Sequence, residues 1–253
     1  MCIRDSCRII LFLEAIRLGA TDTGAVTDSL ERTIVPLSCE HGALRRDSQS
    51  DVCARRYSCV ITNPPYVGRR KLPEESRAFL DKEYPDSSMD LCAAFMERCI
   101  EFVEPGGCLG LVTVDKWLRL KGYEQLRSGG SSFKGLYKTL SLDVVCELGQ
   151  RAFSQVAGLH DGVGISLLTA RVSPPDEEHG FHFVSLTDAR SSHEKARLLE
   201  EWGTSSGESH GARKQVELLS ARSADHFLVA SGIPRALTMP NTLTVRDRVQ
   251  VVV

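Results

Sequence analysis

Asn63, Pro64, Pro65 and Tyr66 form the stretch of this chain whose residue types suit a specific chemistry. An exocyclic amino group on an aromatic ring is a poor nucleophile, because its lone pair is delocalised into the ring. Two acceptors on its two N–H bonds favour the pyramidal, charged transition state over the planar ground state. The Asn63 side-chain oxygen and the Pro64 carbonyl can be those acceptors, and Tyr66 can stack on the ring. The stretch therefore predicts methylation of an aromatic amine; the alternative is a surface turn, in which Asn, Pro and Tyr are common.

The residues directly before this stretch predict the element that positions it. Residues 59–62 are mostly apolar and β-branched, and the run is too short for a helix, so it predicts a buried strand. Pro64 and Pro65 fix their own φ near about −65° and hold each preceding residue in an extended conformation. The loop would then lie at the carboxyl end of a strand, where open α/β sheets bind ligands. This position favours a functional site over a surface turn.

The sequence at 63–66 resembles the catalytic motif of S-adenosylmethionine-dependent amino-group methyltransferases, above all the DNA adenine-N6 enzymes. Residues 89–95 and 103–107 are similar to the helix and turn that follow in that family. Residues 115–127 resemble the Lys-Trp-Leu…Tyr…Leu-Arg segment of its large single-chain restriction-modification members and its phage-defence members of the BREX type. The resemblance covers roughly residues 40–172. It implies an α/β fold: a doubly wound, mostly parallel sheet of the Rossmann-like methyltransferase type with an antiparallel edge strand.

The resemblance also implies roles for individual residues. It makes Asn63, Pro64, Pro65 and Tyr66 catalytic, and it makes Tyr66 and Phe153 the aromatic contacts to an adenine extruded from the duplex. It places S-adenosylmethionine against Asp47, Asp90 and Phe95. By residue type alone, Asp47 is more often an ordinary loop residue and Phe95 more often a core residue, whereas Phe153 is equally a core residue or a base contact. No residue is assignable as the base that takes the released proton.

Two short basic stretches, rather than the net charge, bear on nucleic-acid binding. The net charge of −2 gives no overall signature of nucleic-acid binding. However, Arg69 and Arg70 directly follow the motif, and Lys116 and Lys121 begin a second basic stretch that also includes Arg119, Arg127, Lys134 and Lys138. Such side chains predict contacts to the phosphates of double-stranded DNA, which would be salt-dependent and independent of sequence. The alternative is a solvated helix face.

The rest of the chain predicts the helix and strand alternation of a doubly wound sheet. Apolar periodicity predicts helices over residues 8–18 and 90–103, and a short helix is predicted over 122–128. A polar helix is predicted over 73–83 and a charged helix over 194–202. Strands are predicted over 108–114, 140–148, 162–172 and 181–186. Ser87 or Ser88 is predicted to cap the helix that follows residue 89. The strands at 140–148 and 162–172 are predicted to form an antiparallel pair at the edge of the sheet.

Composition shifts predict the domain organisation. Residues 1–6 have no pattern that continues into the chain, and we interpret them as a non-native leader. Residues 7–172 are predicted to be a partial methyltransferase catalytic domain, and 173–253 a linker and the start of a target-recognition region, because residues 173–178 form a Pro-containing acidic break.

The glycine loop that holds the cofactor in methyltransferases is not found in this sequence. The glycines before residue 60 are Gly19, Gly24 and Gly42, and they form no Gly-x-Gly loop. We therefore expect the isolated chain to be truncated and inactive.

Cysteine and histidine spacing predicts neither a metal site nor disulfides. The nine cysteines include no C-x-x-C pair, and the seven histidines show no ligand spacing. Reduced thiols point to the cytoplasm. No apolar run is long enough to span a membrane.

These observations predict the catalytic core of a DNA adenine-N6 methyltransferase of a restriction-modification or phage-defence system, using S-adenosylmethionine and working with other defence subunits. One alternative is an enzyme that methylates protein glutamine or ribosomal RNA guanine amino groups. Such enzymes end soon after their last strand, whereas this chain runs about eighty residues further. A second alternative is a non-catalytic DNA-binding module. The sequence specifies neither the DNA target nor an accompanying nuclease.

Overall fold

The computed structural model describes residues 21–22, 24, 42–46, 51–153, 162–176, 179–204 and 216–220, which fall into two units. The first unit, Met1–Arg55 with Arg246–Val253, contains the described elements η1 (Gly42–Leu44) and α3 (Asp51–Ala54). The second unit, Arg56–Val245, contains all the other described elements. The predicted leader, the predicted helix at 8–18 and Asp47 lie outside the described residues.

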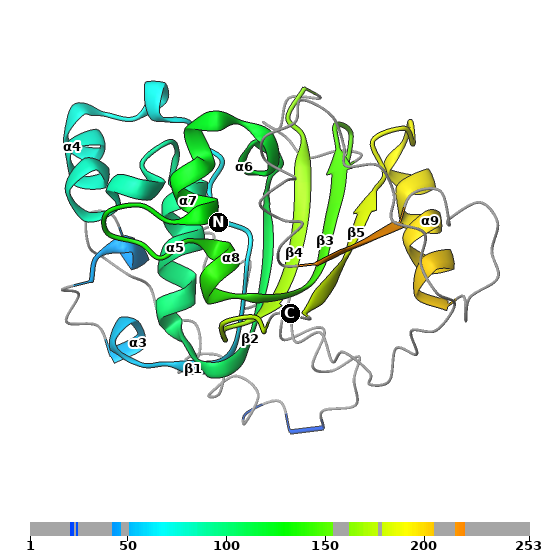
Figure 1. Ribbon diagram of the computed structural model, residues 1–253, viewed down its shortest axis with the longest axis horizontal. Helices are drawn as coiled ribbons and strands as arrows, with labels where there is room; N and C mark the ends of the chain where they lie inside the picture. The colour runs from blue at the N-terminus through cyan, green and yellow to red at the C-terminus, as the bar shows by residue number, and fades with distance from the viewer. Residues whose placement is uncertain are drawn as a thin grey trace. The chain divides into compact units, whose positions relative to one another are not determined.

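A mixed sheet organises the second unit (Figure 1). In the order β1-β2-β4-β3-β5-β6, its described strands are β1 (Tyr57–Thr62), β2 (Val103–Val114), β4 (Ile165–Arg171), β3 (Ser141–Gly149), β5 (Gly180–Ser185) and β6 (Val216–Ser220). β1 is parallel to β2, and β3 is parallel to β5, whereas β4 is antiparallel to both β2 and β3. β1, β2, β3 and β5 therefore run in one direction and β4 and β6 in the other. The predicted α/β class is confirmed, and the sheet is mixed, because β4 and β6 pair antiparallel to their neighbours.

β1 differs from the buried strand that the sequence predicts. Among the described strands it pairs with β2 alone, so it lies at an edge of the sheet. Ile61 is 55% exposed, and Cys59 is exposed opposite Cys108, which is exposed as well. The prediction of burial was wrong because an apolar, β-branched run shows that a strand forms but not which neighbours cover it.

The antiparallel pair forms as predicted, but it does not end the sheet. Leu142 of β3 is paired with Ala170 of β4, and β4 lies between β2 and β3 in the interior. β5 then pairs with β3 beyond the acidic break at 173–178, with Val145 opposite Phe183. The domain boundary predicted at residue 173 therefore does not coincide with the edge of the sheet.

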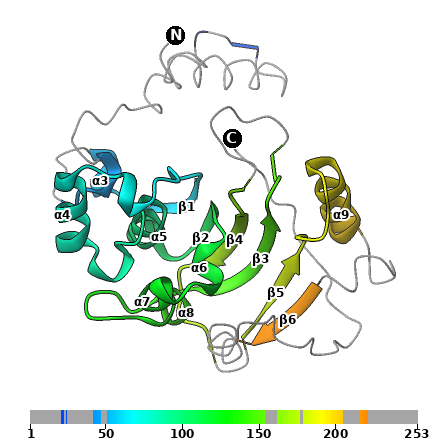
Figure 2. The same cartoon turned by 90° about the horizontal axis from the view of Figure 1, so that it is seen from above.

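Helices lie on both sides of this sheet, as Figures 1 and 2 show. The described helices of the second unit are η2 (Arg69–Lys71), α4 (Glu74–Glu83), η3 (Pro85–Ser87), α5 (Leu91–Phe102), α6 (Lys116–Arg119), η4 (Lys121–Tyr123), α7 (Glu124–Ser128), α8 (Leu136–Thr139) and α9 (Ser192–Thr204). α5, α7 and α8 lie on one side and α9 on the other. The predicted helices near residues 73, 90, 122 and 194 are confirmed.

Alternation along the strands gives each side its own apolar cluster. The larger cluster joins Leu109 and Leu111 of β2 to residues of the helices, including Met96, Ile100, Trp117, Leu126 and Leu136. The smaller cluster, on the side of α9, has Cys146, Leu148, Ile165, Val184 and Leu186 at its centre, with Tyr66, Val112, Ala152, Val163, Leu198 and Leu199 packed against it. Tyr66 therefore packs on the side of the sheet that α9 covers.

The cap of α5 is a residue that the sequence assigned to another role. The Asp90 carboxylate accepts a hydrogen bond from the Ala93 N–H at 2.7 Å. The predicted caps bond elsewhere: the Ser87 hydroxyl donates to the Glu97 carboxylate at 2.6 Å, and the Ser88 hydroxyl donates to the Pro85 carbonyl at 3.4 Å. The prediction placed the cap too early because Ser87 is the last residue of η3 and Ser88 directly follows it.

Asp86 holds the turn between α7 and α8. Its buried carboxylate accepts hydrogen bonds from the backbone N–H groups of Ser131, Ser132 and Phe133, at 3.1, 2.7 and 2.8 Å. Burial raises the pKa of Asp86, but the hydrogen bonds from Ser132, Phe133 and Ser131 outweigh it, so the net pKa is lowered.

We predict that Asp86→Ala lowers the free energy of unfolding by about 3 kcal/mol, because three N–H donors lose their acceptor. Since the folded-state pKa of Asp86 is lowered, its contribution is fully present above pH about 4 and is lost as the pH falls through the folded-state pKa. Urea unfolding at pH 7 and pH 3 measures both effects. Replacing exposed Glu104 with glutamine serves as the control. An equal loss of stability in both variants would contradict the assignment.

Candidate active site at the carboxyl edge of the sheet

The Asn-Pro-Pro-Tyr loop directly follows β1, which ends with Thr62 opposite Leu111 of β2. Asn63 and Pro65 are exposed, Pro64 is buried and Tyr66 is half-buried. The loop is thus at the carboxyl end of a parallel strand, as predicted.

Tyr66 and Asn63 are joined by a hydrogen bond. The Tyr66 hydroxyl donates to the Asn63 Oδ1 and also lies 3.3 Å from the Val112 carbonyl oxygen. Burial, and then the neighbouring Cys92 thiol, raise the pKa of Tyr66 to about 12. The hydroxyl is therefore protonated near neutral pH and acts as a donor. A carboxamide oxygen has two lone pairs, so Asn63 keeps one for a second donor.

Asp90 lies beneath this loop at the start of α5. One carboxylate oxygen caps the helix, and the other accepts a hydrogen bond from the Tyr123 hydroxyl. Burial, and then the charge of Asp90, raise the pKa of Tyr123. A backbone bridge between Gly68 and Asp90 joins the segment after the motif to α5. Both oxygens of Asp90 are therefore used within the fold. Phe95, the other predicted cofactor contact described on α5, is half-buried.

Phe153 reaches the same edge of the sheet from β3. Because β1, β2 and β3 run in one direction, residues 63–66 and 149–153 follow the corresponding ends of their strands. Phe153 is 37% exposed, which argues against a buried core side chain. Its neighbour Ala152 packs against the same apolar cluster as Tyr66. The structure therefore places the two predicted aromatic contacts at the same edge of the sheet, after β1 and after β3.

Sequence reasoning missed a charged cluster at this edge. Asp115 follows β2, and its backbone N–H donates to the Gly164 carbonyl at 2.9 Å. Burial, and then the charge of Glu147, raise the pKa of Asp115. The Arg119 guanidinium pairs with buried Glu147 through both carboxylate oxygens. The position of Asp115 directly after a predicted strand was the signal that could have identified it.

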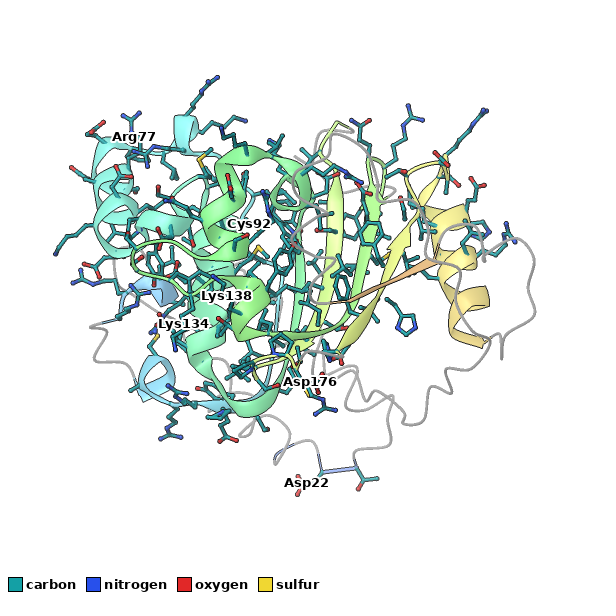
Figure 3. All side chains as sticks on the ribbon, viewed as in Figure 1. Asp22, Arg77, Cys92, Lys134, Lys138 and Asp176 are labelled. Carbon is teal, nitrogen blue, oxygen red and sulfur yellow. The ribbon has the colours of Figure 1, made fainter. Side chains whose placement is uncertain are left out.

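The predicted phosphate-binding residues are in different environments. The Arg69 guanidinium donates to both oxygens of Asp81 at 2.6 Å. Arg70, Lys116 and Lys121 are exposed. Lys134 and Lys138 are also exposed, near α7 and α8 (Figure 3).

Arg127 does not belong to a basic surface. It is 1% exposed, and it donates to the carbonyls of Trp117 and Leu120, the latter at 2.9 Å. The hypothesis that Arg127 is part of a surface for DNA was wrong, because its guanidinium is used to hold the backbone of the 117–120 turn.

The described residues also bear on metals, thiols and membranes. No group of three or more metal-ligating side chains is found in the described ranges. The cysteines that the structure describes in the second unit, Cys59, Cys92, Cys99, Cys108 and Cys146, are free thiols. In the described part of the chain, no helix combines the length and apolar character needed to cross a membrane.

The segment that contains this site is similar to a known protein family. Residues 37–139, which include the Asn-Pro-Pro-Tyr loop, α5 and β2, match the family model described as Eco57I restriction-modification methylase. Over these residues the chain is similar to the Eco57I restriction-modification methylase family. The resemblance inferred from the sequence is confirmed.

Two curated proteins that are similar to this chain are named as adenine-specific methyltransferases. BrxX of Escherichia coli O9:H4 (strain HS) is 31% identical over 154 residues, which cover 60% of this chain and 12% of the relative. PglX of Lacticaseibacillus casei (strain Zhang) is 34% identical over 103 residues, covering 41% of this chain and 8% of the relative. The chain therefore corresponds to a small part of the length of these relatives.

A solved structure shares the fold. The methyltransferase subunit of a type I restriction-modification system from Streptococcus thermophilus aligns with a TM-score of 0.51 and 14% identity, covering 87% of this chain and 47% of that one. At this identity the likeness supports the α/β methyltransferase fold alone.

Proposed function

We propose that the protein containing this methylase segment transfers a methyl group from S-adenosylmethionine to the N6 amino group of adenine in double-stranded DNA, within a restriction-modification or phage-defence system. The observation that carries the proposal is the hydrogen-bonded pair of Asn63 and Tyr66 at the carboxyl end of β1. The names of the curated relatives support adenine as the target base.

The proposed reaction uses acceptors and stacking, and it needs no covalent intermediate. The adenine is extruded from the duplex, which costs a few kcal/mol of unstacking. Tyr66 and Phe153 hold its ring, each contributing about 1–3 kcal/mol. Asn63 Oδ1 and the Pro64 carbonyl accept the two amino N–H bonds, so the nitrogen lone pair turns toward the methyl donor. The alignment of the two reactants supplies much of the rate.

Three residues of the chain are the proposed contacts to the methyl donor. Half-buried Phe95 on α5 is the proposed aromatic contact. Asp90 and Asp47 are the proposed polar contacts; each Asp90 oxygen retains a lone pair beyond the hydrogen bond that it accepts. When bound, S-adenosylmethionine supplies an electrophilic methyl group. The role of the chain's own residues is to orient the amine toward it.

Exposed cations on η2, α6 and η4 are the proposed contacts to DNA phosphates, namely Arg70, Lys116 and Lys121, with Arg69 held beside them by Asp81. We predict that Arg70→Ala and Lys121→Ala each weaken DNA binding and lower the slope of log K against log salt by about one. Fluorescence anisotropy of a labelled duplex between low and moderate salt measures the slope. Exposed Lys82 of α4, replaced by alanine, is the matched control. An unchanged slope in both site variants would contradict the assignment.

Location and further partners follow from the same proposal. The free thiols of the described cysteines fit a reducing cytoplasm. Restriction and defence systems combine methylation with other activities, so we include other defence subunits among the partners.

Calorimetric titration with S-adenosylmethionine tests the proposed cofactor. The longest natural protein that contains this sequence is expected to bind it with a dissociation constant in the micromolar range. ATP, which shares the adenosine group, is the control ligand. A folded protein, judged by circular dichroism, that gives no binding heat with S-adenosylmethionine would contradict the proposal.

A further inference from the structure

Lys195 is a buried lysine on α9 whose hydrogen bonds go to the backbone. It is 2% exposed, and its Nζ lies 2.6 Å from the Leu148 carbonyl oxygen and 2.7 Å from that of Leu186. Burying an ammonium group is unfavourable unless it finds acceptors, and burial lowers the pKa of Lys195. The Lys195 ammonium group therefore holds the Leu148 and Leu186 carbonyls close to each other.

The two carbonyls lie where β3 and β5 end. Leu148 is the next-to-last residue of β3, and Leu186 directly follows β5. The Leu186 N–H donates to the Glu147 carbonyl at 2.8 Å, so the two strand ends are also joined to each other. Lys195 therefore ties α9 to both strand ends at the edge that holds the candidate active site.

The chain turns sharply directly after Leu148. Gly149 has φ +65° and Arg151 has φ +57°, in the left-handed region. A Cβ on Gly149 would lie 3.0 Å from Thr187 Cγ2, so the loop at 149–153 is seated against the segment after β5. A left-handed non-glycine residue persists where its surroundings fix it. The contact with the segment after β5 is made at Gly149, two residues before Arg151.

We propose that Lys195 is a positioning residue, and that α9 and β5 act through it as a clamp on residues 149–153. The clamp sets the side of the sheet on which Phe153 is presented. This inference rests on the proposed function, in which Phe153 stacks on the adenine opposite Tyr66. Leu198 and Leu199 of α9 pack in the same apolar cluster as Tyr66 and as Ala152, the residue directly before Phe153.

The clamp changes the role of the segment after the acidic break. Residues 179–204 would otherwise be a linker to a further domain. In the structure β5 extends the sheet. Lys195 of α9 donates a hydrogen bond to the Leu148 carbonyl, directly before the loop at 149–153. They are therefore part of the methylase core.

Hydrogen–deuterium exchange of the chain tests the clamp without any ligand. Lys195→Met is expected to speed exchange of the amides at 149–153 at least tenfold relative to those of β2, because two carbonyls lose their donor. Lys195→Arg, which keeps two donors, is expected to restore protection to within about threefold of the wild type. Arg197→Met, an exposed substitution on the same helix, is the control. Unchanged exchange at 149–153 in Lys195→Met, or acceleration that is equal at β2, would overturn the proposal.

A short single strand with a central 2-aminopurine, an adenine analogue, tests the consequence for the site. Stacking in the site is expected to quench its fluorescence. Phe153→Ala and Lys195→Met are both expected to reduce the quench at least threefold, whereas Arg197→Met keeps it. If Lys195→Met does not fold, Lys195→Gln takes its place in both experiments, because glutamine is too short to reach both carbonyls.

The exchange and fluorescence experiments distinguish the positioning role of Lys195 from the proposed contact of Phe153 with the base. A quench that Phe153→Ala removes and Lys195→Met leaves intact would overturn the positioning role. A quench that Phe153→Ala leaves intact would instead remove Phe153 from the proposed base contacts. In that outcome the exchange measurement still decides whether Lys195 fixes the loop.

Discussion

Asn63→Ala is expected to lower the rate of methyl transfer to adenine by about 10²–10³-fold, the usual loss when one preorganised group that stabilises a transition state is removed. The Asn63 Oδ1 accepts from the Tyr66 hydroxyl and has a second lone pair for the amino group. Alanine removes this acceptor and leaves the Pro64 carbonyl alone. Initial rates with radiolabelled S-adenosylmethionine and adenine-containing duplex DNA measure the loss.

Two further variants test whether the effect of Asn63→Ala comes from the lost acceptor oxygen. Asn63→Asp keeps acceptor oxygens at the same position and is expected to retain more activity than alanine. Gln125→Ala removes an exposed carboxamide on α7 and is expected to keep the wild-type rate. Because Asn63 is exposed, its replacement should leave the thermal unfolding midpoint unchanged. Turnover like that of the wild type in Asn63→Ala would contradict the mechanism.

Tyr66→Ala is expected to lower the rate by roughly 5–150-fold, because a stack on the base contributes about 1–3 kcal/mol. Tyr66→Phe keeps the ring and removes the hydroxyl that bonds Asn63 and Val112. Its expected loss is about fivefold, equivalent to one hydrogen bond of about 1 kcal/mol. Steady-state kinetics of both variants measure the difference between stacking and orientation of Asn63.

The pH dependence provides an independent check on Tyr66. Its pKa is raised to about 12, so the hydroxyl remains a donor across the range in which DNA methylation can be measured. The ratio of wild-type to Tyr66→Phe rates is therefore expected to be constant between roughly pH 6 and pH 9. A ratio that changes within this range, or equal losses in the alanine and phenylalanine variants, would contradict the separate roles of ring and hydroxyl.

The local features of the site could be predicted from the sequence, because they depend on neighbouring residues in the chain. A short β-branched run followed by two prolines is enough to place Asn63 and Tyr66 after a strand. Apolar periodicity likewise located α5 and the pairing of β3 with β4. These signals are set by backbone conformation and side-chain alternation within a few residues.

Features that depend on distant neighbours could not be predicted. The exposure of Ile61 follows from the position of β1 in the sheet, and the burial of Arg127 follows from the packing of the turn at Trp117. Lys195 lies in the helix predicted at 194–202, but its acceptors are nine and forty-seven residues away in the chain. Residue type alone does not specify such contacts.

The most direct test of the proposed function is the identity of the methylated base. The longest natural protein that contains this sequence is incubated with S-adenosylmethionine and a DNA library, and the DNA is hydrolysed and analysed by mass spectrometry. N6-methyladenine is the expected product, and Asn63→Ala is expected to form it about 10²–10³-fold more slowly. Absence of N6-methyladenine above the Asn63→Ala background, from a folded protein that binds S-adenosylmethionine, would contradict the assignment.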